Sequence, residues 1–148
     1  MRIGDVVCDC RNAPDLERTL VKSGALIGTF AHSDRVLTEA DEKAKCFKQT
    51  GADAVEMESS AVVSACRSRN IPVAVLRVIS DTSDESLPLD FNHFSKADGS
   101  LSMPRLLMGI ALSPSSITKL IKFNRQLDVA ARQLGTVLER FLLPGDFS

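Results

Sequence analysis

The chain has 148 residues, 44% hydrophobic and 25% charged, with a formal net charge of -1, and we expect one globular domain spanning residues 1–148. The near-neutral charge argues against a nucleic-acid partner, because surfaces that follow phosphates carry an excess of Lys and Arg. No apolar run has the length of a membrane span and the N-terminus lacks the apolar stretch of a signal peptide, so we expect a cytoplasmic protein with a small-molecule partner.

Short apolar strands alternate with amphipathic helices along the chain, a pattern typical of an α/β fold. The first strand is predicted at Asp5 to Cys10. The next helix is expected to begin with Asn12 as its N-cap and Pro14 just inside it, and to end near Gly24. Residues 25–30 then form the second predicted strand.

A second helix is predicted to begin at Thr38 with a capping-box-like start, in which Asp41 stands where Glu or Gln is usual. Gly51 is expected to end it as a left-handed residue. Residues 54–57 enter the sheet as a strand. The helix over residues 60–69 carries several small side chains, which permit close packing against that sheet.

The strand over residues 71–79 is almost continuously apolar, as expected for a central strand covered on both faces. Residues 85–102 are rich in Asp, Ser, Gly and Pro and indicate a long loop that could cover a site. Ser113 as N-cap and Pro114 begin a long amphipathic helix that continues through Phe141. Together these elements predict a three-layer α/β/α fold with a mixed, largely parallel sheet.

The four cysteines point to a reducing environment. Cys8 and Cys10 are separated by one residue and Cys46 and Cys66 stand alone, so neither a CxxC pair nor a zinc spacing is present. We expect all four to be reduced and mostly buried. A nucleophilic cysteine would need a nearby His to generate the thiolate, and nothing local supports one.

Two acidic residues follow strands at positions where open α/β sheets bind ligands. Glu58 follows the strand 54–57 and Asp81 follows the strand 71–79, so we expect both at one sheet edge. Glu58 could accept hydrogen bonds from paired hydroxyls such as those of a ribose. Asp81, partly desolvated and near other carboxylates, would have a raised pKa and could hold a proton for a leaving group. The alternative is that both acids only cap helices or favour their first turns.

Other sites compete with this one. Asp81, Asp84 and Glu85 could bind a divalent cation, but three acids in five loop residues are typical of a solvated turn, and we expect neither a metal nor a cofactor. Ser80 as a nucleophile lacks a GxSxG elbow and a partner His. His32 follows a strand and is expected to line a pocket.

Several motifs, taken in order, resemble the purine nucleoside phosphorylase and methylthioadenosine/S-adenosylhomocysteine nucleosidase superfamily. The resemblance covers most of the chain, and its tail, from Asp90 through Gly99 and the Pro114 helix, resembles the hopanoid-associated phosphorylase branch. The motifs are Gly-Thr-Phe-Ala-His-Ser-Asp at 28–34, Glu-Met-Glu at 56–58, Ile-Pro-Val at 71–73 and Arg-Val-Ile-Ser-Asp-Thr-Ser-Asp at 77–84.

The resemblance implies cleavage of the N-ribosidic bond of an adenosine-type purine nucleoside, by phosphate as co-substrate or by water. It implies that Asp81 is the catalytic residue, protonating or hydrogen-bonding purine N7, that Glu58 holds the ribose hydroxyls and that Met57 packs on the sugar. Val36 and Leu37 match a segment beside the base and could contribute backbone contacts. The implied substrate-binding set is Glu58, Met57, Glu56, Val36, Leu37 and Ser80.

The sequence also departs from the family pattern. Ser33 replaces a common glycine and Ser83 a common alanine, which are mild changes. The family's first strands, phosphate loop and basic residues precede the segment matching residues 1–5, so the resemblance implies the C-terminal portion of the fold, truncated at the N-terminus, without the nucleophile half of the site. A catalytically inactive nucleoside-binding or interaction module, or a fragment without a role of its own, therefore stays open. An uncovered sheet edge would favour a homo-oligomer.

Overall fold

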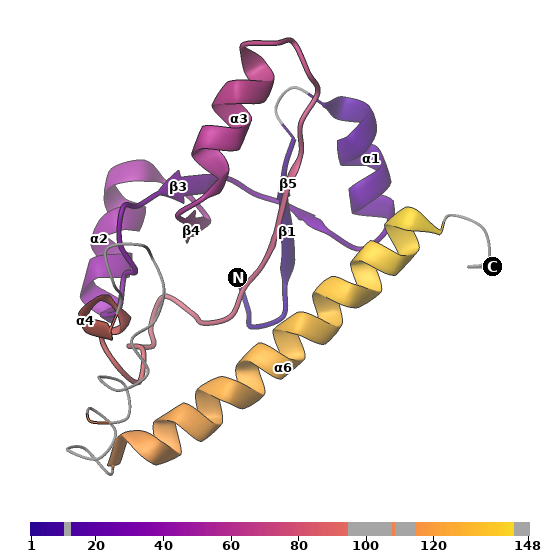
Figure 1. Ribbon diagram of the computed structural model, residues 1–148. Coiled ribbons are helices and arrows are strands. Elements are labelled where there is room, and N and C mark those ends of the chain that lie inside the picture. Colours follow the sequence, from indigo (N-terminus) through magenta and orange to yellow (C-terminus); the bar gives the residue numbers. More distant parts are fainter. Residues whose placement is uncertain (11–12, 95–107, 109–114, 144–148) are drawn as a thin grey trace.

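The computed structural model of the chain describes residues 1–10, 13–94, 108 and 115–143 (Figure 1). Strands and helices alternate through the first half, which confirms the mixed α/β class predicted from the sequence. The elements are β1 (Val6–Asp9), α1 (Pro14–Lys22), β2 (Leu26–Ile27), β3 (Phe30–His32), α2 (Ala40–Thr50), β4 (Ala54–Glu56), α3 (Ser59–Arg67), β5 (Val75–Val78), α4 (Phe91–Phe94) and α6 (Ser115–Leu142).

The described strands form two small sheets instead of the one sheet that we expected. β1 is the centre of a three-stranded sheet in the order β2-β1-β5. β2 is parallel to β1, with Val7 opposite Leu26, whereas β5 is antiparallel to it, with Val7 opposite Arg77. β3 and β4 form a separate parallel pair in which Phe30 lies opposite Ala54. The sheet is therefore mixed, as predicted, but divided.

Gly28 lies where the chain passes from the first sheet to the second, so the predicted strand 25–30 is two strands. A Cβ atom at this position would lie 2.6 Å from Cγ1 of Val7, a residue with no exposed surface. Glycine thus allows the backbone to approach β1 closely and then to leave it. The Gly28 amide still donates to the Cys8 carbonyl at 3.0 Å.

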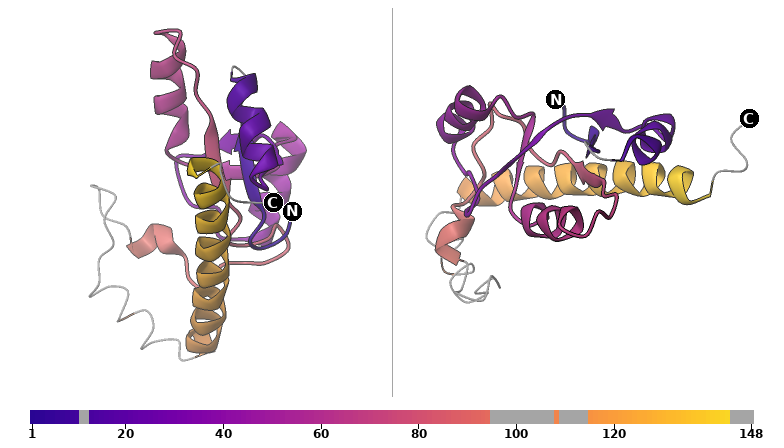
Figure 2. Two further views of the ribbon diagram at one scale, coloured as in Figure 1. Left: turned by 90° about the vertical axis from the view of Figure 1, so that its right-hand side faces the viewer. Right: turned by 90° about the horizontal axis from the view of Figure 1, so that it is seen from above.

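The core lies between the three-stranded sheet and the helices α1 and α6, which pack along one side of β1 and β5 (Figure 2). Cys8, in β1, and Cys10, one residue beyond its end, are both buried in this core, as expected, while Cys46 and Cys66 are half-buried. All four thiols are free. The buried residues of this core are Val6, Cys8, Cys10, Leu20, Ala25 and Val137.

The helix boundaries differ slightly from those predicted. The box at the start of α2 uses Glu42, whose carboxylate accepts from the amides of Thr38 at 3.1 Å and Glu39 at 3.3 Å, where the sequence pattern had suggested Asp41. Gly51 ends this helix with a φ of 66°, as predicted. α3 begins one residue earlier and ends two residues earlier than expected.

The last part of the chain is dominated by α6, which runs diagonally beneath β1 and β5 in Figure 1. Its predicted starting residues Ser113 and Pro114 lie outside the described residues, as do Asn12 and residues 95–102 of the predicted loop. In the described part of that loop, α4 occupies Phe91–Phe94. No helix in the described ranges combines the length and the apolar character that a bilayer crossing requires.

Candidate functional site

The two acidic residues singled out in the sequence follow strands of different sheets. Glu58 comes after β4, which pairs with β3, whereas Asp81 comes after β5, which pairs with β1. The expected common sheet edge is therefore wrong. The reason is the pairing: β5 turns antiparallel to β1 instead of lying parallel beside β4.

Arg77 connects the two sheets at this point. From β5 its Nη2 donates to Glu58 Oε2 at 2.7 Å, to Ser59 Oγ at 3.0 Å and to Glu56 Oε2 at 3.3 Å. In the sequence Arg77 stands within a motif, and no role was predicted for it. Its signal was a cation within an otherwise apolar strand, which requires a partner when the strand is covered.

Glu56 performs the helix-capping role that the alternative interpretation gave to Glu58. Its carboxylate accepts from the backbone amides of Glu58 at 2.8 Å and Ser59 at 2.5 Å, at the start of α3. Its side chain is 8% exposed. Burial alone would raise the pKa of Glu56, but the amides of Ser59 and Glu58, the Ser59 hydroxyl and the Arg77 guanidinium together lower it. Glu56 is thus an anion that the fold uses structurally.

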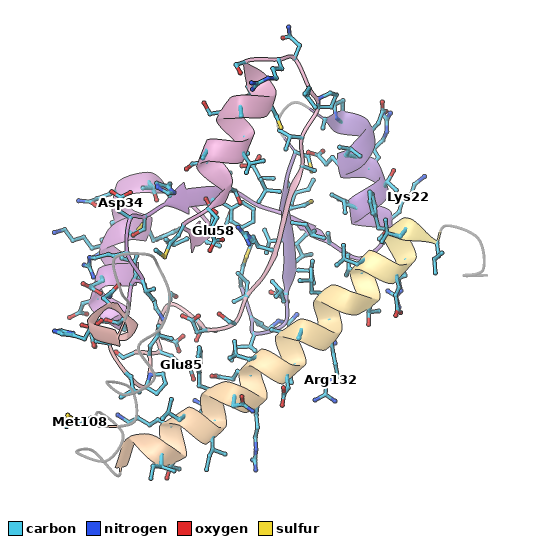
Figure 3. The ribbon with its side chains drawn as sticks, in the orientation of Figure 1. Lys22, Asp34, Glu58, Glu85, Met108 and Arg132 are labelled. Atoms are coloured by element: carbon cyan, nitrogen blue, oxygen red, sulfur yellow. The ribbon has the colours of Figure 1, made fainter. Side chains whose placement is uncertain are left out.

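Glu58 is left available to solvent. Its side chain is 76% exposed and makes no capping hydrogen bond, although the residue occupies the N-cap position of α3. Figure 3 shows Glu58 at the end of α3 that lies nearer the centre of the molecule. Arg77 binds one carboxylate oxygen and fixes its orientation. A carboxylate held in this way can accept hydrogen bonds from a pair of hydroxyls, and the neighbouring Met57 is 41% exposed beside it.

Asp81 contacts a lysine instead of the neighbouring carboxylates that we expected. Lys43, on α2, donates to Asp81 Oδ2 at 2.6 Å, and the Ser80 hydroxyl donates to Asp81 Oδ1 at 2.7 Å. The side chains of Lys43 and Asp81 are 11% and 23% exposed. Sequence reasoning missed Lys43, because one lysine among several on an amphipathic helix carries no signal.

The loop acids considered for a metal contact other residues of this chain. Glu85 binds Lys122 Nζ at 2.5 Å and Gln126 Nε2 at 2.9 Å, and these hydrogen bonds lower its pKa. A hydrogen bond from the Thr82 hydroxyl lowers the pKa of Asp84. Over the described ranges, no cluster of three or more His, Cys, Asp or Glu side chains could hold a metal ion.

Val36 is held by a side chain from α4. The Val36 amide donates to Asn92 Oδ1 at 3.0 Å, and Asn92 Nδ2 donates to the Val36 carbonyl at 2.9 Å. Asn92 is itself oriented by Asp90, to which Nδ2 donates at 2.9 Å. Both backbone groups that we expected Val36 to offer to a base, beside Leu37, therefore already have a partner.

A cavity of about 160 Å³ lies between α3 and the strands. His32 lines it, as expected, with Ser60 Oγ 3.2 Å from its Nδ1 and Asp34 Oδ1 3.2 Å from its Nε2. The volume is below the roughly 300 Å³ at which pockets for small ligands usually begin, so these residues enclose only part of a nucleoside-sized molecule. A larger hollow of about 460 Å³ lies between Ile3 and α6 and contains no predicted site residue.

Comparisons with known proteins support the family resemblance of the sequence. The chain matches the family described as the phosphorylase superfamily over residues 11–110. It is similar to the aminodeoxyfutalosine nucleosidases of Campylobacter jejuni and of two strains of Helicobacter pylori, with 34% identity over 67 residues in each case. That stretch covers 45% of this chain but only 29% of each relative. No solved structure matches the chain significantly.

Proposed function

The chain belongs to the phosphorylase superfamily, which matches it over more than half its length, and on that premise we propose that it binds an adenosine-type purine nucleoside and serves cleavage of its N-ribosidic bond. The observation that carries the proposal is the state of Glu58. Its carboxylate is exposed, oriented by Arg77 and released from helix capping by Glu56. A purely structural acid at this position would instead cap α3.

The proposed roles follow from the charge that develops as the bond breaks. Cleavage leaves a sugar with oxocarbenium character and an electron-rich base, so interactions that strengthen in that state lower the barrier. Glu58 holds the ribose hydroxyls close to the developing positive charge, and Met57 packs on the sugar. Asp81 forms a hydrogen bond with N7 of the departing purine. The remaining members of the proposed set are Leu37, Ser80, Val36 and Glu56. Asn92 would first have to release the Val36 backbone, and Glu56 contributes by holding the start of α3 beside Glu58.

The attacking group is water in this proposal. Two observations support that choice over phosphate. The relatives are nucleosidases by name, and Arg77, the cation that binds Glu58, already contacts two carboxylates. Phosphate stays the alternative co-substrate, and the assay below separates the two.

A nucleoside-binding module without turnover is the second candidate. It is supported by the contact of Asp81 with Lys43 and by the 160 Å³ cavity, which is small and whose lining includes Glu56 but neither Glu58 nor Asp81. Such a module would keep the sugar and base contacts without a nucleophile.

One experiment tests both candidates. Adenosine binding is measured by calorimetry, and adenine release is followed with and without inorganic phosphate, for the wild type, Glu58→Gln and Asp81→Asn. Exposed acids on α6 provide matched controls, Glu139→Gln and Asp128→Asn. We expect both site variants to lose at least about tenfold in affinity or rate, the loss typical of a hydrogen bond to a charged group, and both controls to behave as wild type. Binding without turnover favours the second candidate, and absence of binding refutes both.

We also propose that the protein self-associates. β2 is an edge strand of its sheet, and its residues Leu26 and Ile27 are 47% and 63% exposed. Exposed apolar edges of this kind pair readily with another chain. A monomeric mass by light scattering at high concentration would contradict the proposal.

A further inference from the structure

Lys43 has an unusual number of partners for a helix lysine. Its ammonium donates to Asp81 Oδ2 at 2.6 Å, to the Glu85 carbonyl at 2.6 Å and to the Thr82 carbonyl at 3.0 Å. An ammonium has three donors, so these acceptors use all of them. The side chain is 11% exposed, whereas Lys45 and Lys48 on the same helix are exposed. Lys43 therefore serves a specific contact and not general solvation.

These contacts fix both the acid and the loop that carries it. Asp81 is held at both oxygens, by Lys43 and by the Ser80 hydroxyl. The loop is held from its other side as well, because Glu85 binds Lys122 and Gln126 of α6 (Figure 3 labels Glu85). The loop after β5 is thus secured between α2 and α6.

We propose that Lys43 is a positioning residue for Asp81: its ammonium sets the direction of the carboxylate and the course of residues 81–85, so that Asp81 meets the ligand as a fixed hydrogen-bond acceptor. The inference rests on the proposed function for the identity of the ligand, a purine nucleoside. The placement of Asp81 itself does not depend on that identity.

A consequence for recognition follows from this arrangement. A carboxylate that accepts from Lys43 and Ser80 keeps further lone pairs. Asp81 can therefore accept from the amino group of an adenine-type base, and from N7 once that nitrogen has gained a proton as the bond breaks. Glu58, which binds the sugar in this proposal, is oriented by Arg77 and not by Lys43. Loss of Lys43 should therefore affect the base side of the site and leave the sugar side intact.

The first test uses the ligand-free protein. Lys43→Met keeps an unbranched side chain, one atom shorter, and removes the charge, and Lys45→Met is the matched control. We expect Lys43→Met to speed amide hydrogen exchange in residues 81–85 by roughly tenfold, and Lys45→Met to leave it unchanged. In a double-mutant cycle on unfolding, Lys43→Met and Asp81→Asn should be coupled by about tenfold in the unfolding equilibrium constant. Unchanged exchange, or additive effects, would overturn the inference.

The second test measures adenosine affinity. We expect Lys43→Met to bind adenosine about tenfold more weakly. Its effect on the binding free energy should be non-additive with that of Asp81→Asn and additive with that of Glu58→Gln. Lys43→Arg should restore part of the affinity, because it keeps a cation beside Asp81; it also replaces Lys43→Met if that variant does not fold. Full additivity with Asp81→Asn would overturn the inference. If the wild type binds no adenosine, the proposed function fails, and the exchange and unfolding results decide the role of Lys43.

Discussion

Replacing Arg77 by Met tests how the two sheets are held together at the site. The substitution keeps an unbranched chain on β5 and removes the guanidinium that contacts Glu56, Glu58 and Ser59. We expect a less stable protein, chiefly because the 8% exposed carboxylate of Glu56 loses its cation.

The magnitude can be worked from the individual contacts. A hydrogen bond to a buried charge contributes about 1.5–3 kcal/mol, while the bond to the 76% exposed Glu58 contributes little because solvent screens it. Arg77 Nε is buried and has no hydrogen-bond partner among the described residues, so removing it relieves a desolvation cost of about 1 kcal/mol. The balance is a loss of about 0.5–2 kcal/mol, or roughly 1–8 °C in melting temperature for a chain of this size.

Chemical denaturation as a function of pH is the assay, with Arg69→Met as the control. The Arg69 side chain is exposed and donates to the Ala65 carbonyl at 3.1 Å, away from any carboxylate bond of the site. The pKa of Glu56 is lowered in the native state, so its contribution to stability is full above the ordinary value of 4.5 and is lost as the pH falls through the lowered value. Without Arg77 that pKa moves back toward 4.5, so the variant loses less on acidification. The stability gap between wild type and Arg77→Met should therefore narrow below pH 4.5.

Two results would refute this reasoning. The first is a variant as stable as Arg69→Met at neutral pH. The second is a stability gap that stays constant on acidification, since the contact with Glu56 would then contribute nothing.

Other substitutions and reagents test the fold directly. Gly28→Ala should destabilise the protein by about 1–3 kcal/mol, because the added methyl group overpacks the core. Gly135→Ala should stabilise α6 by about 0.5–1 kcal/mol, because its Cβ has no atom within 4 Å apart from its chain neighbours and the backbone of its own helix. Denaturant titrations of both variants measure the two changes, and equal effects on stability would contradict the prediction. Burial raises the pKa of the Cys10 thiol to about 12, so iodoacetamide at mildly alkaline pH should label Cys46 and Cys66 first, as followed by peptide mass spectrometry. Early labelling of Cys10 would show that the chain just after β1 is accessible to the reagent.

The sequence predicted the elements better than their arrangement. Alternating apolar runs and helix signals located most helices within two residues, and Gly51 ended α2 as expected. The division into two sheets was not predictable. An apolar run such as 71–79 indicates that a strand is covered on both faces, but it does not indicate which strand it pairs with. Gly28 carried the missing information, but only its contact with Val7 shows why.

The site was predictable in its residues and not in their partners. Glu58 and Asp81 were singled out because each follows a predicted strand, where open α/β sheets bind ligands. Their counterions, Arg77 and Lys43, come from other elements, and tertiary packing alone selects Lys43 from the lysines of α2. The capping role moved from Glu58 to Glu56 for the same reason: a difference of two residues depends on how α3 leaves β4.

The contact between Asn92 and Val36 gives the site a competitor within its own chain. The carboxamide occupies both the amide and the carbonyl of Val36, and because it is tethered it acts at a high effective concentration. A base that used the same backbone groups would have to displace the Asn92 carboxamide. The observed affinity for that base would be its intrinsic affinity multiplied by the fraction of molecules in which Asn92 has released Val36. The strength of this internal contact thus sets a lower limit on the ligand concentration at which the Val36 backbone can take part in recognition.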